Sequence, residues 1–162
     1  MTVTITAQVD QVGGEVSAAA SAGAPIAMGT EASGSPSATD PKELMLVALA
    51  GCAGLDVAGI LTKKRQRVTT YEIEVHGESA EDPPRVFTSI IVEHRVSGDV
   101  APEPLRRSIE LSATKYCPVN AMLSAVARVE HRYLLLDATG TKHAATVAIV
   151  GPNRVVQVIQ GV

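Results

Sequence analysis

Two cysteines are the residues of this sequence best suited to carry out chemistry. Cys52 lies in the segment AGCAG (residues 50–54), whose small neighbours allow another element to approach its sulfur closely. Cys117 directly precedes Pro118, far along the chain. In a reducing compartment such thiols are either nucleophiles or packing groups, since free cysteine is among the most buried residue types. The residues themselves leave both roles open.

The local surroundings of the two cysteines differ in charge. Cys117 occupies the N-cap of a helix predicted to begin at Pro118, where backbone N–H groups and the helix dipole stabilise a thiolate, and Lys115 is near in sequence. Asp56 follows Cys52 by four residues and shares its helix face, and a neighbouring carboxylate disfavours a thiolate. Local physics therefore predicts that Cys117 ionises more easily than Cys52.

Lys42 and Glu43 stand at the start of the same helix as Cys52. Asp40 is a good N-cap, Pro41 suits the first helical position, and Glu43 completes a capping-box pattern. At 100° per residue, Glu43 points about 180° away from Cys52, and Lys42 about 80° away. A capping role for Glu43 is therefore the alternative to an activating one.

The four histidines do not form a recognisable ligand set. They lack the paired spacing of metal ligands, and the sequence contains no P-loop, no dinucleotide-binding glycine pattern and no nucleophile elbow. We therefore expect neither a bound metal nor a cofactor. The histidines are His76, His94, His131 and His143.

Composition excludes several classes of protein. The chain has 162 residues, which corresponds to about one domain. Apolar residues make up 46% of it, enough for a core, while a net charge of −3 and few aromatic residues argue against nucleic-acid binding. No lysine or arginine precedes Lys42, so a secretory signal is not expected and the predicted location is cytoplasmic.

A long helix is predicted over residues 40–64. Its apolar run from Leu44 to Leu61 is shorter than the roughly 20 residues of a membrane span and contains Asp56. We therefore expect no membrane segment, but a helix buried on all sides. A sheet covers only one side of a helix, so dimerisation is a natural hypothesis for the others.

The rest of the chain carries strand and helix patterns in separate groups. Polar and apolar residues alternate over residues 2–9, which predicts a half-buried strand. Pro118 ends one helix near Tyr116 and opens the next, because the residue before proline disfavours helical geometry. This order of elements predicts an α+β fold with a largely antiparallel sheet. Further strands are predicted at 15–20, 26–28, 69–76, 86–96, 129–136, 146–150 and 155–159, and helices at 102–116 and 118–127.

Both cysteine segments resemble motifs of a known family. PKELMLVALAGC (residues 41–52) resembles the first cysteine motif of the OsmC/Ohr family, the osmotically inducible and organic hydroperoxide resistance proteins, and LSATKYCPV (residues 111–119) resembles the second. The segments GLDV, IL and RVFT, at residues 54–57, 60–61 and 85–88, are similar to its YhfA-like branch. The resemblance covers residues 1–136, a single OsmC-like domain, and leaves 137–162 as a C-terminal extension, predicted as a β-hairpin.

The resemblance implies a fold and an activity. The expected fold is α+β, with antiparallel sheets wrapped around long central helices in an intertwined homodimer. The expected activity is a cofactor-free thiol peroxidase that reduces organic hydroperoxides, with Cys52 as the peroxidatic and Cys117 as the resolving cysteine. A small dithiol reductant, of lipoyl type in the family, would restore both thiols.

The sequence departs from this family in the group that activates the reactive cysteine. Active members hold the thiolate with an Arg–Glu pair whose Arg comes from the N-terminal region, whereas no arginine precedes Arg65 here. Lys42, Arg65 or Arg85 from either subunit could substitute, with Glu43 as the nearest carboxylate to the expected position. The alternative is a non-enzymatic dimer of the same fold that binds a hydrophobic ligand or senses redox state.

Overall fold

The computed structural model describes residues 2–20, 23–30, 38–152 and 155–159, which fall into two compact units, Met1–Met45 and Leu46–Val162. The first unit contains an antiparallel sheet in the order β1 (Thr6–Asp10), β2 (Glu15–Ala19) and β3 (Ile26–Met28). The predicted strands are present, but β1 is fully exposed rather than half-buried. Among the described residues of this unit, no second layer packs on β1, so Val9 remains 66% exposed.

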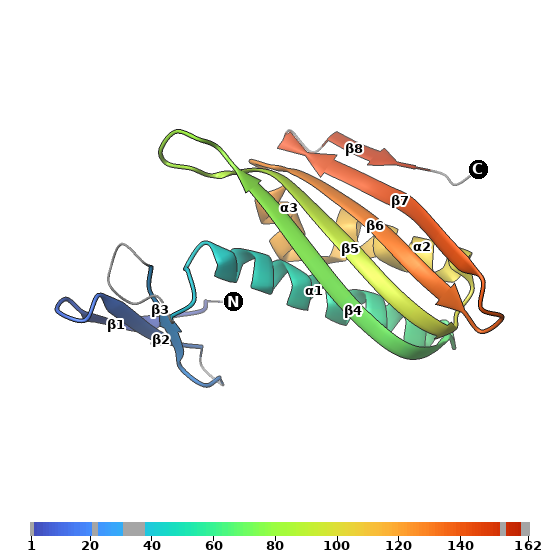
Figure 1. Ribbon diagram of the computed structural model, residues 1–162, viewed down its shortest axis with the longest axis horizontal. Coiled ribbons are helices and arrows are strands. Elements are labelled where there is room, and N and C mark those ends of the chain that lie inside the picture. The colour runs from blue at the N-terminus through green and yellow to red at the C-terminus, as the bar shows by residue number, and fades with distance from the viewer. Residues whose placement is uncertain (1, 21–22, 31–37, 153–154, 160–162) are drawn as a thin grey trace. The chain divides into compact units, whose positions relative to one another are not determined.

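The second unit is built on a five-stranded sheet, seen in Figure 1. β5 and β6 pair in parallel and the other neighbours are antiparallel. The parallel pair was not predicted; it arises because the chain crosses back through helices between β5 and β6. The predicted α+β class is confirmed. In spatial order the strands are β4 (Arg67–Ser79), β5 (Phe87–Asp99), β6 (Arg128–Asp137), β7 (Lys142–Gly151) and β8 (Val155–Val158).

The C-terminal strands continue this sheet. β7 pairs with β6 from Leu136 opposite Lys142 to Val129 opposite Val150, and β8 pairs antiparallel with β7. The division into a family domain at 1–136 and an extension at 137–162 stays a prediction.

Helix α1 (Glu43–Lys63) begins close to where it was predicted. The Asp40 carboxylate accepts a hydrogen bond from the Lys42 N–H at 2.7 Å, and the Asp40 carbonyl accepts one from the Leu44 N–H at 3.2 Å. By length and composition alone α1 is apolar enough to cross a membrane, but one of its faces packs in the core of the second unit.

The prediction that α1 is buried on all sides is wrong for the single chain. One stripe with four-residue spacing is fully buried against the sheet, while Val47 and Leu55 on other faces are 60% and 79% exposed. A sheet can cover only one face of a helix, which accounts for the difference. The stripe consists of Leu49, Ala53, Val57 and Leu61.

Two short helices and the turn between them complete the second unit. They are α2 (Pro102–Leu111), the π-helical turn η2 (Ser112–Tyr116) and α3 (Pro118–Leu123). The predicted break before Pro118 is confirmed, although α3 ends at Leu123 rather than near residue 127. Together with α1 these elements cover the face of the sheet that carries Ile90, Val92 and Val129.

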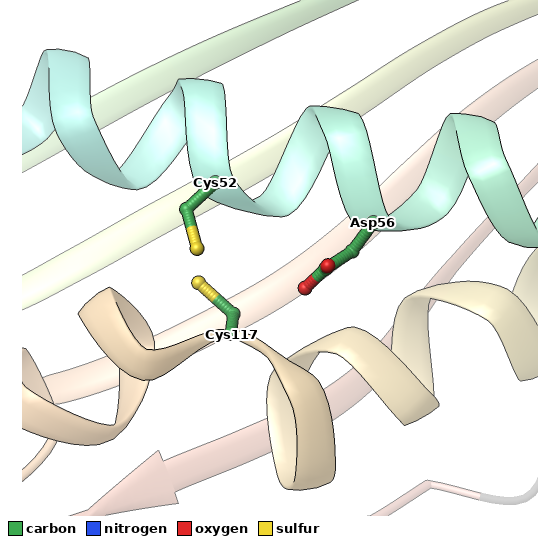
Figure 2. Close-up of side chains that lie close together, drawn as sticks. All are labelled: Cys52, Asp56 and Cys117. Atoms are coloured by element: carbon green, nitrogen blue, oxygen red, sulfur yellow. The ribbon is translucent and has the colours of Figure 1, made fainter. Parts of the chain in front are cut away.

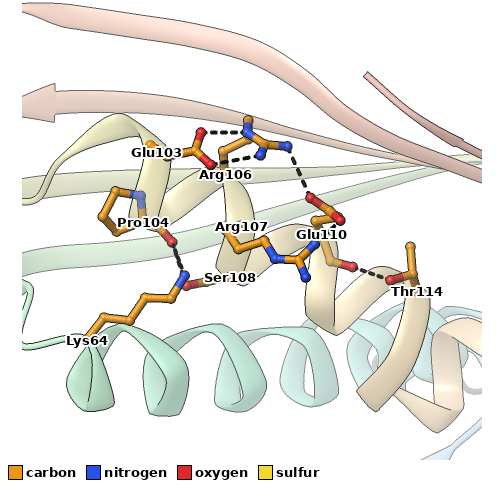
Figure 3. Close-up of polar contacts among 8 residues, drawn as sticks. All are labelled: Lys64, Glu103, Pro104, Arg106, Arg107, Ser108, Glu110 and Thr114. Atoms are coloured by element: carbon orange, nitrogen blue, oxygen red, sulfur yellow. Dashed lines mark hydrogen bonds and ion pairs between the residues drawn. The ribbon is translucent and has the colours of Figure 1, made fainter. Parts of the chain in front are cut away.

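Polar contacts tie α2 to the end of α1 (Figure 3). The Lys64 Nζ donates a hydrogen bond to the Pro104 carbonyl at 3.0 Å. Arg106 forms two hydrogen bonds of 2.8 Å with the Glu103 carboxylate and a third, of 3.1 Å, with Glu110. The Lys64 bond holds the first turn of α2 next to the end of α1, and the Arg106 bonds lie within α2 itself.

Substitution of Gly98, in β5, tests how closely β4 approaches β5. Gly98 has a φ of +135°, and a Cβ there would collide with the Arg67 carbonyl oxygen and lie 2.7 Å from the Thr69 nitrogen. We expect Gly98→Ala to lower the free energy of unfolding by about 3 kcal/mol or more, because it combines backbone strain with overpacking. Urea unfolding measures the change.

Gly140→Ala is the matched control for this substitution. Gly140 also has a positive φ, of +83°, but nothing lies within 4 Å of its Cβ position. It should lose only about 1 kcal/mol, the cost of the backbone conformation. Equal losses at the two positions would contradict the close approach of β4 to β5 at Gly98.

Candidate active site

The structure brings the two cysteines together. Cys52 projects from the middle of α1 and Cys117 from the junction of η2 and α3, and their sulfurs face each other in Figure 2. The two sulfurs and a carboxylate oxygen of Asp56 all lie within 4.8 Å of one another. Both cysteines are free thiols; Cys52 is partly exposed, whereas Cys117 is only 3% exposed.

The backbone of η2 and α3 places Cys117. Its N–H donates to the Ser112 carbonyl at 3.0 Å, a bond to the fifth preceding residue that defines the π turn. Cys117 is then extended, with φ −73° and ψ 105°, as expected before Pro118. Its sulfur accepts a hydrogen bond from the Asn120 N–H at 3.3 Å. The predicted N-cap position of Cys117 is confirmed.

The predicted acidity of Cys117 is wrong. Burial, the largest effect, and the hydrogen bond with Cys52 raise the pKa of this thiol to about 12, even though the Asn120 N–H acts in the opposite direction. The N-cap contact therefore exists, but the loss of hydration outweighs it. At neutral pH Cys117 is a protonated thiol.

Asp56 is the third member of the cluster. Its Oδ2 accepts a hydrogen bond from the Ser112 hydroxyl at 3.1 Å, and its charge contributes to the raised pKa of Cys117. Among the described residues these three side chains form the set close enough to hold a metal ion, with two sulfur donors and one oxygen donor. The expectation of no metal stays a prediction.

A groove adjoins the cluster. It has a volume of about 530 Å³, and Asp56 lies at its wall beside apolar side chains such as Leu55, Ile60 and Leu111. Tyr116, in η2, lines it as well. Asp56 is the member of the cluster that lines this groove, and Lys63 lines it too. Lys42 and Glu43, the predicted activating residues, belong to the first unit, and their role stays a prediction.

Sequence reasoning missed a buried polar chain that ends beside Cys117. The Tyr71 hydroxyl lies 2.7 Å from His94 Nδ1, His94 Nε2 lies 3.3 Å from His131 Nδ1, and His131 Nε2 lies 3.0 Å from Asn120 Oδ1. The Asn120 Nδ2 donates to the Ala113 carbonyl at 2.6 Å. Both histidines and Asn120 are fully buried.

One signal in the sequence could have revealed these histidines. His94 lies two residues from each of the inward-facing Val92 and Val96, and His131 lies two residues from Val129. Because alternate residues of a strand point to the same side, both histidines fall on the apolar face of their strands. Burial lowers the pKa of both imidazoles, that of His131 to about 4. They are therefore neutral at physiological pH.

Comparison with known proteins identifies the family. The family model described as OsmC-like protein matches residues 34–132. The chain belongs to this family, which confirms the resemblance seen in its two cysteine motifs.

Individual relatives agree with this assignment. Protein YhfA of Escherichia coli K12 is 38% identical over 102 residues, which are 62% of this chain and 76% of the relative. The crystal structure of a hypothetical protein from Aquifex aeolicus has a TM-score of 0.76 at 26% identity, covering 85% of this chain and 98% of the other. The organic hydroperoxide resistance protein OhrB of Bacillus subtilis shares the fold, with a TM-score of 0.60 at 15% identity over 82% of this chain and 98% of its own.

Mild acid should destabilise the protein through His94 and His131. A histidine that stays neutral when folded but has a pKa of about 6.5 when unfolded lets the unfolded state bind more protons. Its contribution is complete above pH 6.5 and is lost as pH falls towards the folded pKa. Between pH 7.5 and 5.5 we expect the two histidines together to lower the free energy of unfolding by about 2–3 kcal/mol.

Urea unfolding at constant protein concentration measures this change. His76 is exposed, so His76→Gln should leave the pH dependence as it is in the wild type. Stability that stays constant from pH 7.5 to 5.5 would mean that the histidines are not held neutral in the core.

The charge of Asp56 should be measurable at Cys117. Asp56→Asn keeps an oxygen acceptor for Ser112 but removes the negative charge that disfavours the Cys117 thiolate. In a Cys52→Ser background we expect the Cys117 pKa to fall, by at most about 1, because burial has the larger effect. Thiolate absorbance near 240 nm, followed against pH and corrected for tyrosine ionisation through the absorbance at about 295 nm, gives the midpoint. An unchanged midpoint would show that the carboxylate is screened from the thiol.

Proposed function

We propose that the protein is a thiol peroxidase that reduces organic hydroperoxides through Cys52 and Cys117. The observation that carries the proposal is the cysteine pair itself, with sulfurs within 4.8 Å, one partly exposed and one buried. A disulfide has a bond length of about 2.05 Å, so the two sulfurs need to move closer together before the bond forms. Membership of the OsmC-like family and the fold shared with a hydroperoxide resistance protein support the same function.

The exposure of the two thiols supports a division of roles. Cys52 is the one a substrate can reach, so its thiolate attacks the terminal peroxide oxygen. The O–O bond breaks, the alcohol leaves with a proton, and Cys52 becomes a sulfenic acid. Cys117 then attacks the Cys52 sulfur: the S–S bond forms, the S–O bond breaks, and the departing hydroxide takes the Cys117 proton to give water.

The surroundings of the pair support organic substrates and an external dithiol. The groove beside Asp56 has a mixed lining, and its apolar side chains Leu55, Ile60 and Leu111 favour the organic part of a hydroperoxide over hydrogen peroxide. A small dithiol of lipoyl type restores both thiols by thiol–disulfide exchange. Neither step requires a cofactor. The location that belongs to this proposal is the cytoplasm, where a reducing environment keeps thiols reduced.

A homodimer is part of the proposal. Large apolar side chains on the helices of the second unit and in the turn after α3 stay exposed in the single chain, and a second copy would remove them from water. The partner is also a source for the cation that activates Cys52, with Lys42, Arg65 and Arg85 of either subunit as candidates and Glu43 as a possible carboxylate partner for it. The exposed apolar side chains are Val47, Leu55, Tyr116, Met122 and Val126.

A second candidate function is a non-enzymatic dimer that binds a hydrophobic ligand or senses redox state slowly. One observation favours it: the pKa of Cys117 is raised, with the Asp56 carboxylate contributing, and the thiolate is the reactive form of cysteine. Turnover separates the two functions.

Fully reduced protein mixed with one equivalent of cumene hydroperoxide tests the proposal. Peroxide loss and intact mass are followed together in wild type, Cys52→Ser and Cys117→Ser. We expect rapid loss with an internal disulfide in wild type, a persistent sulfenic acid in Cys117→Ser, and loss at the buffer rate in Cys52→Ser. Equally slow oxidation of all three proteins would exclude the peroxidase and favour the binding or sensing function.

A further inference from the structure

A buried carbonyl next to Cys117 needs a donor from outside its own helix. In the π turn, the Cys117 N–H bonds the Ser112 carbonyl. The next carbonyl, of Ala113, would take the N–H of residue 118 in the same pattern, but Pro118 has none. The side chain of Asn120 supplies the donor instead, with Nδ2 at 2.6 Å from the Ala113 oxygen.

This contact fixes the orientation of the Asn120 amide, and through it the hydrogen-bond directions of His131, His94 and Tyr71. The Ala113 carbonyl can only accept, so Asn120 presents its Nδ2 to that carbonyl and its Oδ1 to His131. His131 must then donate from Nε2 and accept at Nδ1 from His94 Nε2. His94 in turn accepts at Nδ1 from the Tyr71 hydroxyl.

All four hydrogen bonds are therefore donated in one direction along the chain, from Tyr71 to the Ala113 carbonyl, and each histidine has one defined neutral tautomer. Within the described part of the chain, no buried side-chain nitrogen or oxygen lacks a partner. Burial keeps both imidazoles uncharged and keeps the Tyr71 phenol protonated by raising its pKa. A chain of this kind holds its last member rigidly, because any rotation of that member leaves a buried polar group unpaired.

The last member, Asn120, is bound directly to the thiol. Its backbone N–H donates to Cys117 Sγ at 3.3 Å, while its side chain donates a hydrogen bond to the Ala113 carbonyl, in the turn that precedes Cys117. We propose that Asn120, held by His131, His94 and Tyr71, is the positioning residue that aims the Cys117 sulfur at Cys52 and so sets the rate of disulfide formation. This inference rests on the resolving role proposed for Cys117.

The test separates the two chemical steps. Sulfenic acid formation on Cys52 is followed by trapping with dimedone, and disulfide formation by intact mass after a timed acid quench. For Asn120→Ala we expect the first rate within about twofold of wild type and the second about tenfold slower or more, because a small misplacement of a reacting group costs at least that much. A wild-type rate of disulfide formation, or equal loss of both rates, would overturn the proposal.

A pair of substitutions at His131 keeps the test decisive if Asn120→Ala does not fold. His131→Gln can keep an N–H donor near the Nε2 position, facing Asn120, whereas the shorter His131→Asn cannot reach it. We expect His131→Gln to retain most of the wild-type rate and His131→Asn to behave like Asn120→Ala. The reverse order would overturn the proposal. The exposed His76→Gln is the control for histidine replacement.

Diamide distinguishes failure of this proposal from failure of the peroxidase. A thiol adds to its N=N bond, the second thiol displaces the resulting hydrazine, and the disulfide forms without any peroxide. Suppose that wild type fails to react with peroxide and still forms the disulfide with diamide. If Asn120→Ala then forms this disulfide about tenfold more slowly than wild type, the positioning role of Asn120 is supported although the peroxidase proposal fails. If Asn120→Ala closes it at the wild-type rate with diamide, the positioning role is excluded.

In wild type, nitrogen-15 NMR of the imidazoles tests the direction of the hydrogen bonds on which the proposal depends. Both His94 and His131 should be neutral at pH 7, with the proton on Nε2. A proton on Nδ1 of either ring would reverse the direction of the hydrogen bonds and overturn the inference.

Discussion

The packing of α1 on the five-stranded sheet is the contact on which the rest of the second unit depends. Leu49, Ala53, Val57 and Leu61 recur every four residues and are fully buried, so they fix the rotation of the helix about its axis. Cys52 and Asp56 each precede a member of this stripe, and that rotation turns both towards η2 and α3 (Figure 2). The same stripe leaves the remaining apolar faces of α1 exposed.

The opposite wall of the site is set by backbone hydrogen bonding. A π turn that runs into a proline leaves one carbonyl without a helical partner, and the chain places Asn120 where its amide can supply one. The amide is in turn hydrogen-bonded to His131, which contacts His94, and both histidines are buried. Such a polar chain is stable only when every group is paired, which is the case among the described residues.

These two walls create a site that brings the two sulfurs together but keeps one of them protonated. The sulfurs are close enough to react with each other, yet burial and the Asp56 carboxylate both favour the protonated form of Cys117. A thiol in such surroundings becomes an effective nucleophile only when its proton has a destination. In the proposed cycle the hydroxide that leaves Cys52 provides one, so the chemistry of the first step enables the second.

The sequence by itself determined the features that act between chain neighbours. Asp40 and Pro41 start α1, Pro118 breaks the helix after Tyr116, and Cys117 becomes an N-cap, because caps and proline geometry need only adjacent residues. The alternating strands and the family motifs could be read in the same way, and the α+β class followed from the order of the elements.

Only the tertiary structure decided which distant groups meet. The parallel pairing of β5 with β6, the raised pKa of Cys117 and the neutral state of His94 and His131 all depend on residues far apart in sequence. Local rules predicted an acidic Cys117 because they contain the helix dipole but not the burial. A group loses its hydration only when the whole fold closes around it, so its neighbours in the sequence do not reveal that loss.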